Sequence, residues 1–103
     1  MSTTLKLTEP TVFNDLNKTK NRPPESETTE LPLITLKYKH FRDVLKYPER
    51  DQMHHLMLMM TGLSENDLGE LNADDAAEVS KLIFSAMKKY MDLGKQIVQS
   101  MNE

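Results

Sequence analysis

PERDQMHHLMLMMTGLSENDLGEL, residues 48–71, is the stretch around which the chain is organised. Pro48 suits the first turn of a helix, where its missing N–H removes no intrahelical hydrogen bond. Gly62 suits the left-handed residue that commonly ends a helix. The stretch therefore predicts a helix over residues 48–61.

One face of this helix is apolar. Its members recur at i, i+3, i+4 and i+7, the spacing that forms a single stripe facing the core. They are Met53, Leu56, Met57 and Met60.

A second side of the same helix is also apolar. Leu58 and Met59 point away from the stripe, beside His54 and His55, where a surface helix normally carries polar residues. Either other helices of the chain cover this side, or it meets another copy or another protein, because flexible Met side chains repack easily around varied partners.

Two capping signals follow this helix. Ser64 is expected to cap a short helix over residues 65–71, with Asp67 as the acid of a capping box. Asn72 and Asp75 repeat the same spacing at the start of the next helix. Tight turns are therefore predicted on both sides of the short helix.

Two further helices flank these residues. Residues 40–47 predict a short helix with Phe41, Val44 and Leu45 turned inward. Residues 73–100 predict the longest helix of the chain. Its broad apolar face comprises Ala76, Val79, Ile83, Ala86, Met87, Tyr90, Ile97 and Met101.

The N-terminal part of the chain predicts β-structure. Residues 3–7 and 31–38 have the composition of strands, and Pro10 limits how far the first can run. Residues 17–30 contain no apolar side chain except proline, which predicts a mobile loop. We expect the strands to form a hairpin that packs on the helices or joins the sheet of a neighbouring copy.

Length and element order set the fold class. A chain of 103 residues is long enough for one hydrophobic core but not for two. The prediction is a single, mainly α domain over residues 1–103. An N-terminal β-hairpin over residues 1–38, with its mobile loop, precedes three to four helices over residues 39–103.

Composition argues against several function classes. The 13 Lys and Arg residues are scattered among 16 acidic residues, so no basic patch for nucleic acid is evident. The absence of cysteine removes disulfides and thiolate chemistry. No apolar run reaches the roughly 18 residues that a membrane span needs, and the N-terminus lacks the pattern of a signal peptide. We therefore expect a cytoplasmic protein without nucleic-acid or membrane partners.

Catalytic and metal-binding patterns are weak. His54 and His55 are adjacent, so on a helix they diverge by about 100° and do not grip one ion as an i, i+4 pair does. Asp51 and His55 have that spacing, but two ligands are too few for a closed site. Asp74 and Asp75 suit the first turn of a helix. No enzymatic activity, metal or cofactor is expected.

The order of elements and motifs resembles that of the small tail assembly chaperones of long-tailed bacteriophages. The resemblance covers ITLKYKHFRDVL, residues 34–45, and LMLMMTGLSENDLGELNADDAAEVSKLIFSAM, residues 56–87. Its clearest part consists of Thr61-Gly62-Leu63, Asp67-Leu68, Leu71 and Asp75.

This resemblance implies a specific role. Proteins of this family are non-catalytic, self-associating helical proteins that coat the tape measure protein, keep it soluble and recruit tail tube subunits. In many of these phages a ribosomal frameshift makes a longer second product that shares the same N-terminal sequence. The resemblance therefore implies a homo-oligomer of the host cytoplasm that is absent from the mature virion.

The residues themselves indicate a protein-binding module, but they do not by themselves indicate a role in tail assembly. Excess apolar helix surface and Met-rich chemistry suit a groove for a hydrophobic helix. The alternative is a helical, dimeric adaptor or regulator unrelated to tails. The candidate partner-binding residues are Met53, Leu56, Met57, Leu58, Met59, Met60, Tyr90, Ile97 and Met101.

Overall fold

The computed structural model describes the backbone of residues 3–102 and the side chains of residues 3–91. Within that part the chain is mainly helical, with five helices and an N-terminal antiparallel hairpin. The elements in chain order are β1 (Thr3–Val12), α1 (Asn14–Thr19), β2 (Glu27–Leu33), α2 (Tyr38–Val44), α3 (Glu49–Thr61), α4 (Glu65–Gly69) and α5 (Ala73–Asn102).

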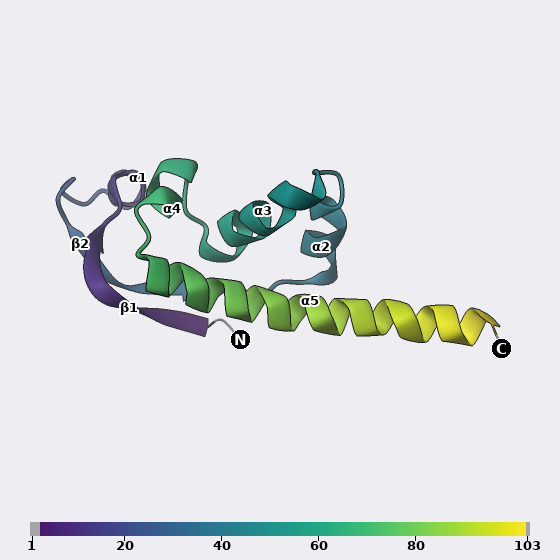
Figure 1. The fold of residues 1–103 in the computed structure, drawn as a ribbon. Coiled ribbons are helices and arrows are strands. Elements are labelled where there is room, and N and C mark those ends of the chain that lie inside the picture. Colours follow the sequence, from purple (N-terminus) through teal and green to yellow (C-terminus); the bar gives the residue numbers. More distant parts are fainter. Residues whose placement is uncertain (1–2, 103) are drawn as a thin grey trace.

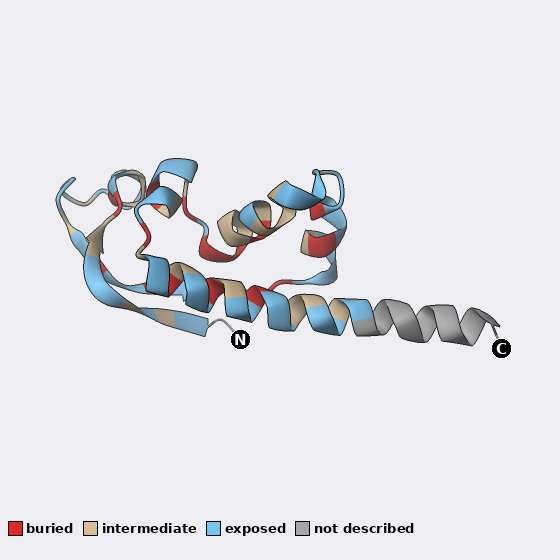
Figure 2. Cartoon of the chain, in the orientation of Figure 1, coloured by how far each residue is buried: buried red, intermediate tan, exposed pale blue. Residues whose placement is uncertain are grey.

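Helix α5 forms one long side of the molecule, and the other elements lie along it (Figure 1). α2 and α3 pack on α5, β1 runs beside its N-terminal part, and α1 contacts α4. Buried positions face inward between α5 and the elements opposite it (Figure 2). The buried hydrophobic residues are Phe13, Leu31, Leu33, Leu36, Phe41, Val44, Leu56, Met60, Leu63, Leu71, Val79 and Ile83.

The predicted hairpin is present, but β1 is longer than the strand expected over residues 3–7. Lys6 pairs with Glu30 and Thr11 with Thr28, so the register is broken between these two pairs by a bulge in β1. Pro10 lies in this bulge. There its missing N–H removes no bond of the ladder, and β1 therefore continues past it to Val12.

The prediction of a loop over residues 17–30 is wrong at both ends. Its first residues belong to α1, a helix not expected from the sequence, and its last residues belong to β2. Asn17 is fully buried, and its side-chain amide donates to the carbonyl oxygens of Pro24 at 3.0 Å and Ser26 at 2.9 Å. A polar side chain can therefore order a connection that has no apolar residue.

The second strand and the first predicted helix both begin and end earlier than expected. β2 ends at Leu33 rather than at residue 38, and α2 covers Tyr38–Val44 rather than residues 40–47. Phe41 and Val44 are buried as predicted. Leu45 is 59% exposed, because it follows the last residue of α2, so its predicted inward position is wrong.

The Met-rich helix and its boundaries agree with the sequence. Pro48 directly precedes α3, and Gly62 ends it with a φ of 69°. The amide of Gly62 donates to the carbonyl oxygen of Leu58 at 2.9 Å. Leu56 and Met60 are buried, and Met53 and Met57 pack against the core.

The long helix also has its predicted inner face. Val79 and Ile83 are fully buried. Four further members of that face are partly buried against the core: Ala76, Ala86, Met87 and Tyr90. The side chains of Ile97 and Met101 lie outside the described residues.

Two buried aspartates join the helices to the N-terminal segment. The carboxylate of Asp67 accepts hydrogen bonds from the backbone amides of Asp15 at 3.2 Å and Leu16 at 2.8 Å. These are orphan donors in the first turn of α1, whose own N-cap residue, Phe13, offers no side-chain acceptor. Asp67 therefore caps α1 from another element.

Asp75 acts in the same way on the bulge of β1. Its carboxylate accepts from the amide of Thr8 at 3.1 and 3.2 Å and from the Thr8 hydroxyl at 3.2 Å. The roles of Asp67 and Asp75 as capping-box acids of their own helices are therefore wrong. Ser64 and Asn72 do cap α4 and α5, accepting from the amides of Asp67 and Asp74 respectively.

Replacing Asp67 by Asn is expected to lower the free energy of unfolding by about 2 kcal/mol, because an amide nitrogen would then face a buried backbone donor. Asp74→Asn is the matched control, since Asp74 also lies in the first turn of a helix but is exposed. It should cost about 0.5 kcal/mol. Urea unfolding measures both values, and equal losses would show that only the helix dipole matters.

Candidate partner-binding groove

An open groove of about 470 Å³ lies between the segment that follows β2, the start of α2 and the middle of α5. Its buried lining is apolar and consists of Leu33, Leu36, Phe41 and Met60. Three large side chains of the lining are exposed to solvent: Ile34 at 45%, Tyr38 at 60% and Leu82 at 36%. The polar lining consists of Thr3, Thr35, Ser85 and Lys89.

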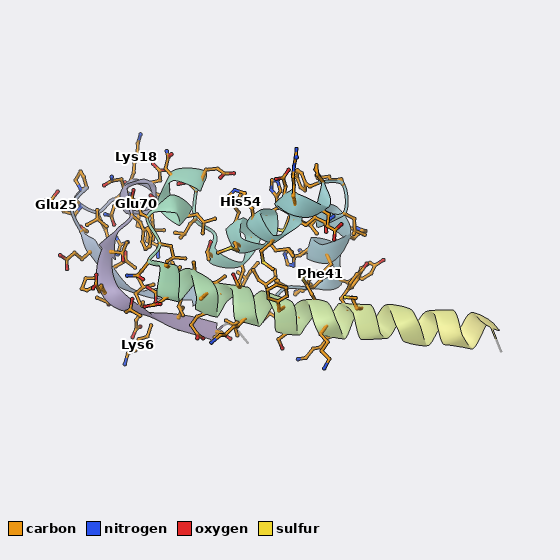
Figure 3. The ribbon with its side chains drawn as sticks, viewed as in Figure 1. Lys6, Lys18, Glu25, Phe41, His54 and Glu70 are labelled. Atoms are coloured by element: carbon orange, nitrogen blue, oxygen red, sulfur yellow. The ribbon has the colours of Figure 1, made fainter. Side chains whose placement is uncertain are left out.

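Aromatic contacts hold the α2 side of the groove against α5. The Tyr90 ring stacks on Phe41, with centroids 5.1 Å apart and planes at 17°. Tyr38 lies 5.8 Å from Tyr90 in a tilted arrangement. In Figure 3 the Phe41 side chain points from α2 toward α5. Such pairs add to the stabilisation from buried area, so this wall of the groove is preformed.

The local chain path explains why Ile34 is exposed. The sequence predicts a strand through residue 38, with Ile34 and Leu36 on the same side. The strand ends at Leu33, and the amide of Ile34 instead donates to the carbonyl oxygen of Met60 at 3.0 Å. The segment then turns toward α2, which buries Leu36 and leaves Ile34 at the rim.

The structure distributes the predicted partner-binding residues over different environments. Met60 and Tyr90 line the groove. Leu56 is only 1% exposed and belongs to the core. Met53, Met57 and Met59 are partly buried and pack against the core, and Leu58 is also partly buried. Ile97 and Met101 lie outside the described side chains.

Three rim residues were not among the predicted partner-binding residues. The sequence places Ile34 and Tyr38 in a strand, and it places Leu82 at the flank of the main apolar face of the last helix. The signal for Leu82 is its position just beside Ile83, at the edge of that face. No local pattern brings Leu82 together with Ile34, because only the tertiary fold does so.

The histidines of α3 have structural partners. His54 Nε2 lies 2.7 Å from Glu65 Oε2, which connects α3 to α4. The His55 ring stacks on Tyr47 with centroids 3.6 Å apart. Within the described part of the chain, no group of three or more His, Cys, Asp or Glu side chains is arranged to hold a metal ion.

Neither the hydropathy of the helices nor the comparison with known proteins assigns a function to the chain. Across the residues that the structure describes, no helix is both long and apolar enough to cross a membrane. No protein-family model, curated protein or solved structure matches the chain. Any functional assignment therefore rests on the chain's own residues and on the sequence resemblance.

The burial pattern of the Met-rich helix leads to a prediction about stability. Leu56→Ala is expected to lower the free energy of unfolding by about 3 kcal/mol, because it leaves a cavity in the core. Leu45→Ala removes the same atoms from an exposed position and should change stability by no more than about 0.5 kcal/mol. Chemical denaturation compares the two, and a small effect of Leu56→Ala would mean that α3 is not a core element.

Proposed function

We propose that this chain is a tail assembly chaperone of a long-tailed bacteriophage. It binds the tape measure protein, keeps it soluble in the host cytoplasm, and helps to recruit tail tube subunits, in part through a frameshifted longer form. The observation that carries this proposal is the open apolar groove with Ile34, Tyr38 and Leu82 exposed around it.

The dimensions and chemistry of the groove suit a hydrophobic helix. Helix-in-groove recognition places successive apolar side chains of one helix into a hydrophobic surface channel. A volume of about 470 Å³ accommodates several such side chains. Tyr38 and Tyr90 supply aromatic contact area, the kind that contributes most to binding energy at interfaces.

The side chains that line the groove suit the binding of an apolar partner rather than catalysis. The described side chains that line it are hydrocarbon, thioether, aromatic or hydroxyl groups, with Lys89 as the one cation among them. Neither a carboxylate nor an imidazole is part of this lining. A chaperone role requires no acid, base or nucleophile, so it matches what the groove offers.

The outer face of α5 favours a second candidate, a dimeric helical adaptor unrelated to tails. Phe84 is 61% exposed and Met91 is 57% exposed, and their spacing of seven residues places them on the same side of the helix. Such a pair suits a seam between two helices. The two candidates differ in partner, since an adaptor would bind a folded protein rather than a long apolar helix.

Co-expression with the long, helix-rich protein encoded downstream tests the chaperone proposal. The chain should keep that protein soluble and co-purify with it in several copies. The double variant Ile34→Gln/Leu82→Gln should lose most of this effect while remaining folded, because both side chains are exposed at the groove.

Leu45→Gln is the matched control for this experiment. Leu45 is 59% exposed and does not line the groove, so its replacement should leave the recovered complex unchanged. If the long protein precipitates equally with and without the chain, the chaperone role is wrong. If it is rescued equally by both variants, the groove is not the binding surface.

A further inference from the structure

Three lysines lie in or next to the lining of the apolar groove, in a chain whose net charge is −3. Lys89 lines the groove on the α5 side. Lys37 and Lys39 flank Tyr38 on the α2 side, and both are exposed. One lysine therefore lines the groove and two are chain neighbours of a lining residue, although acidic residues outnumber basic ones in the whole sequence.

These lysines have no acidic partner within the described residues. The ion pairs of that part of the chain are Arg42–Asp43, Arg50–Asp51, His54–Glu65 and Lys81–Glu78. Asp43, the one acid of α2, is already beside Arg42 at 3.5 Å. None of these ion pairs includes Lys37, Lys39 or Lys89.

Four acidic residues lie away from the groove or are bound within the fold. Glu25 and Glu70 lie at the hairpin end of the molecule, far from Phe41 at the groove (Figure 3). Asp67 and Asp75 are buried and bound to backbone amides. Of these four carboxylates, two therefore lie far from the groove, where salt screens their charge, and two are engaged by backbone donors.

We propose that the groove accepts an amphipathic helix whose apolar stripe is flanked on both sides by Asp or Glu residues. This inference rests on the proposed function and specifies the chemistry of the partner at the same site. The apolar stripe occupies the surface formed by Tyr38, Leu82 and Tyr90. The flanking carboxylates pair with Lys89 on the α5 side of the groove and with Lys37 and Lys39 at the start of α2.

The two parts of this recognition contribute differently. Burial of the apolar stripe supplies most of the affinity, since it removes hydrocarbon from water. The exposed lysine–carboxylate pairs contribute less, and they select among helices and raise the association rate. A helix with the same apolar stripe but basic flanking residues would place like charges near these lysines and would bind more weakly.

Three synthetic helical peptides with one shared apolar stripe test the inference, with Glu, Gln or Lys at the flanking positions. Fluorescence anisotropy should show that the Glu peptide binds the full chain about tenfold more tightly than the Gln peptide at low ionic strength. The Lys peptide should bind most weakly. Raising the salt from about 0.05 M to about 0.5 M should remove most of the difference.

A pair of charge-reversal variants isolates the local effect. Lys37→Glu/Lys89→Glu should invert the order of the Glu and Lys peptides. Lys18→Glu/Lys20→Glu changes the net charge equally, but these residues lie in and just after α1, and Lys18 points away from the molecule at the hairpin end (Figure 3). The order should therefore stay unchanged in this control.

The outcomes separate this inference from the proposed function. Equal binding of the three peptides, with Leu82→Gln weakening all of them, would overturn the acidic preference and leave the groove as the binding site. Binding of none of them would overturn the inference, and the co-expression experiment would then decide on the chaperone role independently. Dissociation of an oligomer by Leu82→Gln in sedimentation without peptide would identify a second copy as the occupant and overturn it too.

Discussion

The carboxylates of Asp67 and Asp75 hold the N-terminal segment of the chain against its helices. Asp67 accepts the first free amides of α1, and Asp75 accepts the amide that the bulge of β1 leaves without a partner at Thr8. Both side chains are almost fully buried, at 2% and 1% exposure. A backbone donor buried without an acceptor costs free energy comparable to a lost hydrogen bond, so these two contacts make the placement of α1 and β1 possible.

The groove follows from this attachment. Because Asp75 lies in the first turn of α5, its bonds to Thr8 fix β1 beside that helix. β2 pairs with β1, so its end at Leu33 lies near the same helix, and the amide of Ile34 bonds to Met60 of α3. The segment that leaves β2 then forms one wall of the groove, and the stack of Phe41 on Tyr90 fixes the opposite wall. Asp75, which does not line the groove, thus helps to place the segment that forms one of its walls.

Local rules predict the elements whose stabilising contacts are local. The Met-rich helix, its left-handed Gly62 and the caps Ser64 and Asn72 are all set by neighbours in sequence, and the structure confirms them. The spacing of Ser64 and Asp67 also fits a capping box, but the Asp67 carboxylate accepts hydrogen bonds from the amides of α1 instead. Local patterns do not predict α1, because its cap comes from a residue about fifty positions away. They do not predict the groove either, because its walls come from separate segments of the chain, and of the predicted partner-binding residues only Met60 and Tyr90 line it.

The clearest residues of the family resemblance are used to build the fold. Thr61 donates its hydroxyl to Met57 and accepts the amide of Leu63, while Gly62 adopts the left-handed conformation between them. Leu63 and Leu71 are buried in the core, and the two aspartates anchor α1 and β1. None of these residues lines the groove. The residues that carry the resemblance therefore stabilise the fold, and the groove is lined by other residues. Ile34, Tyr38 and Leu82 are exposed, so substitutions at these positions should change the free energy of unfolding little.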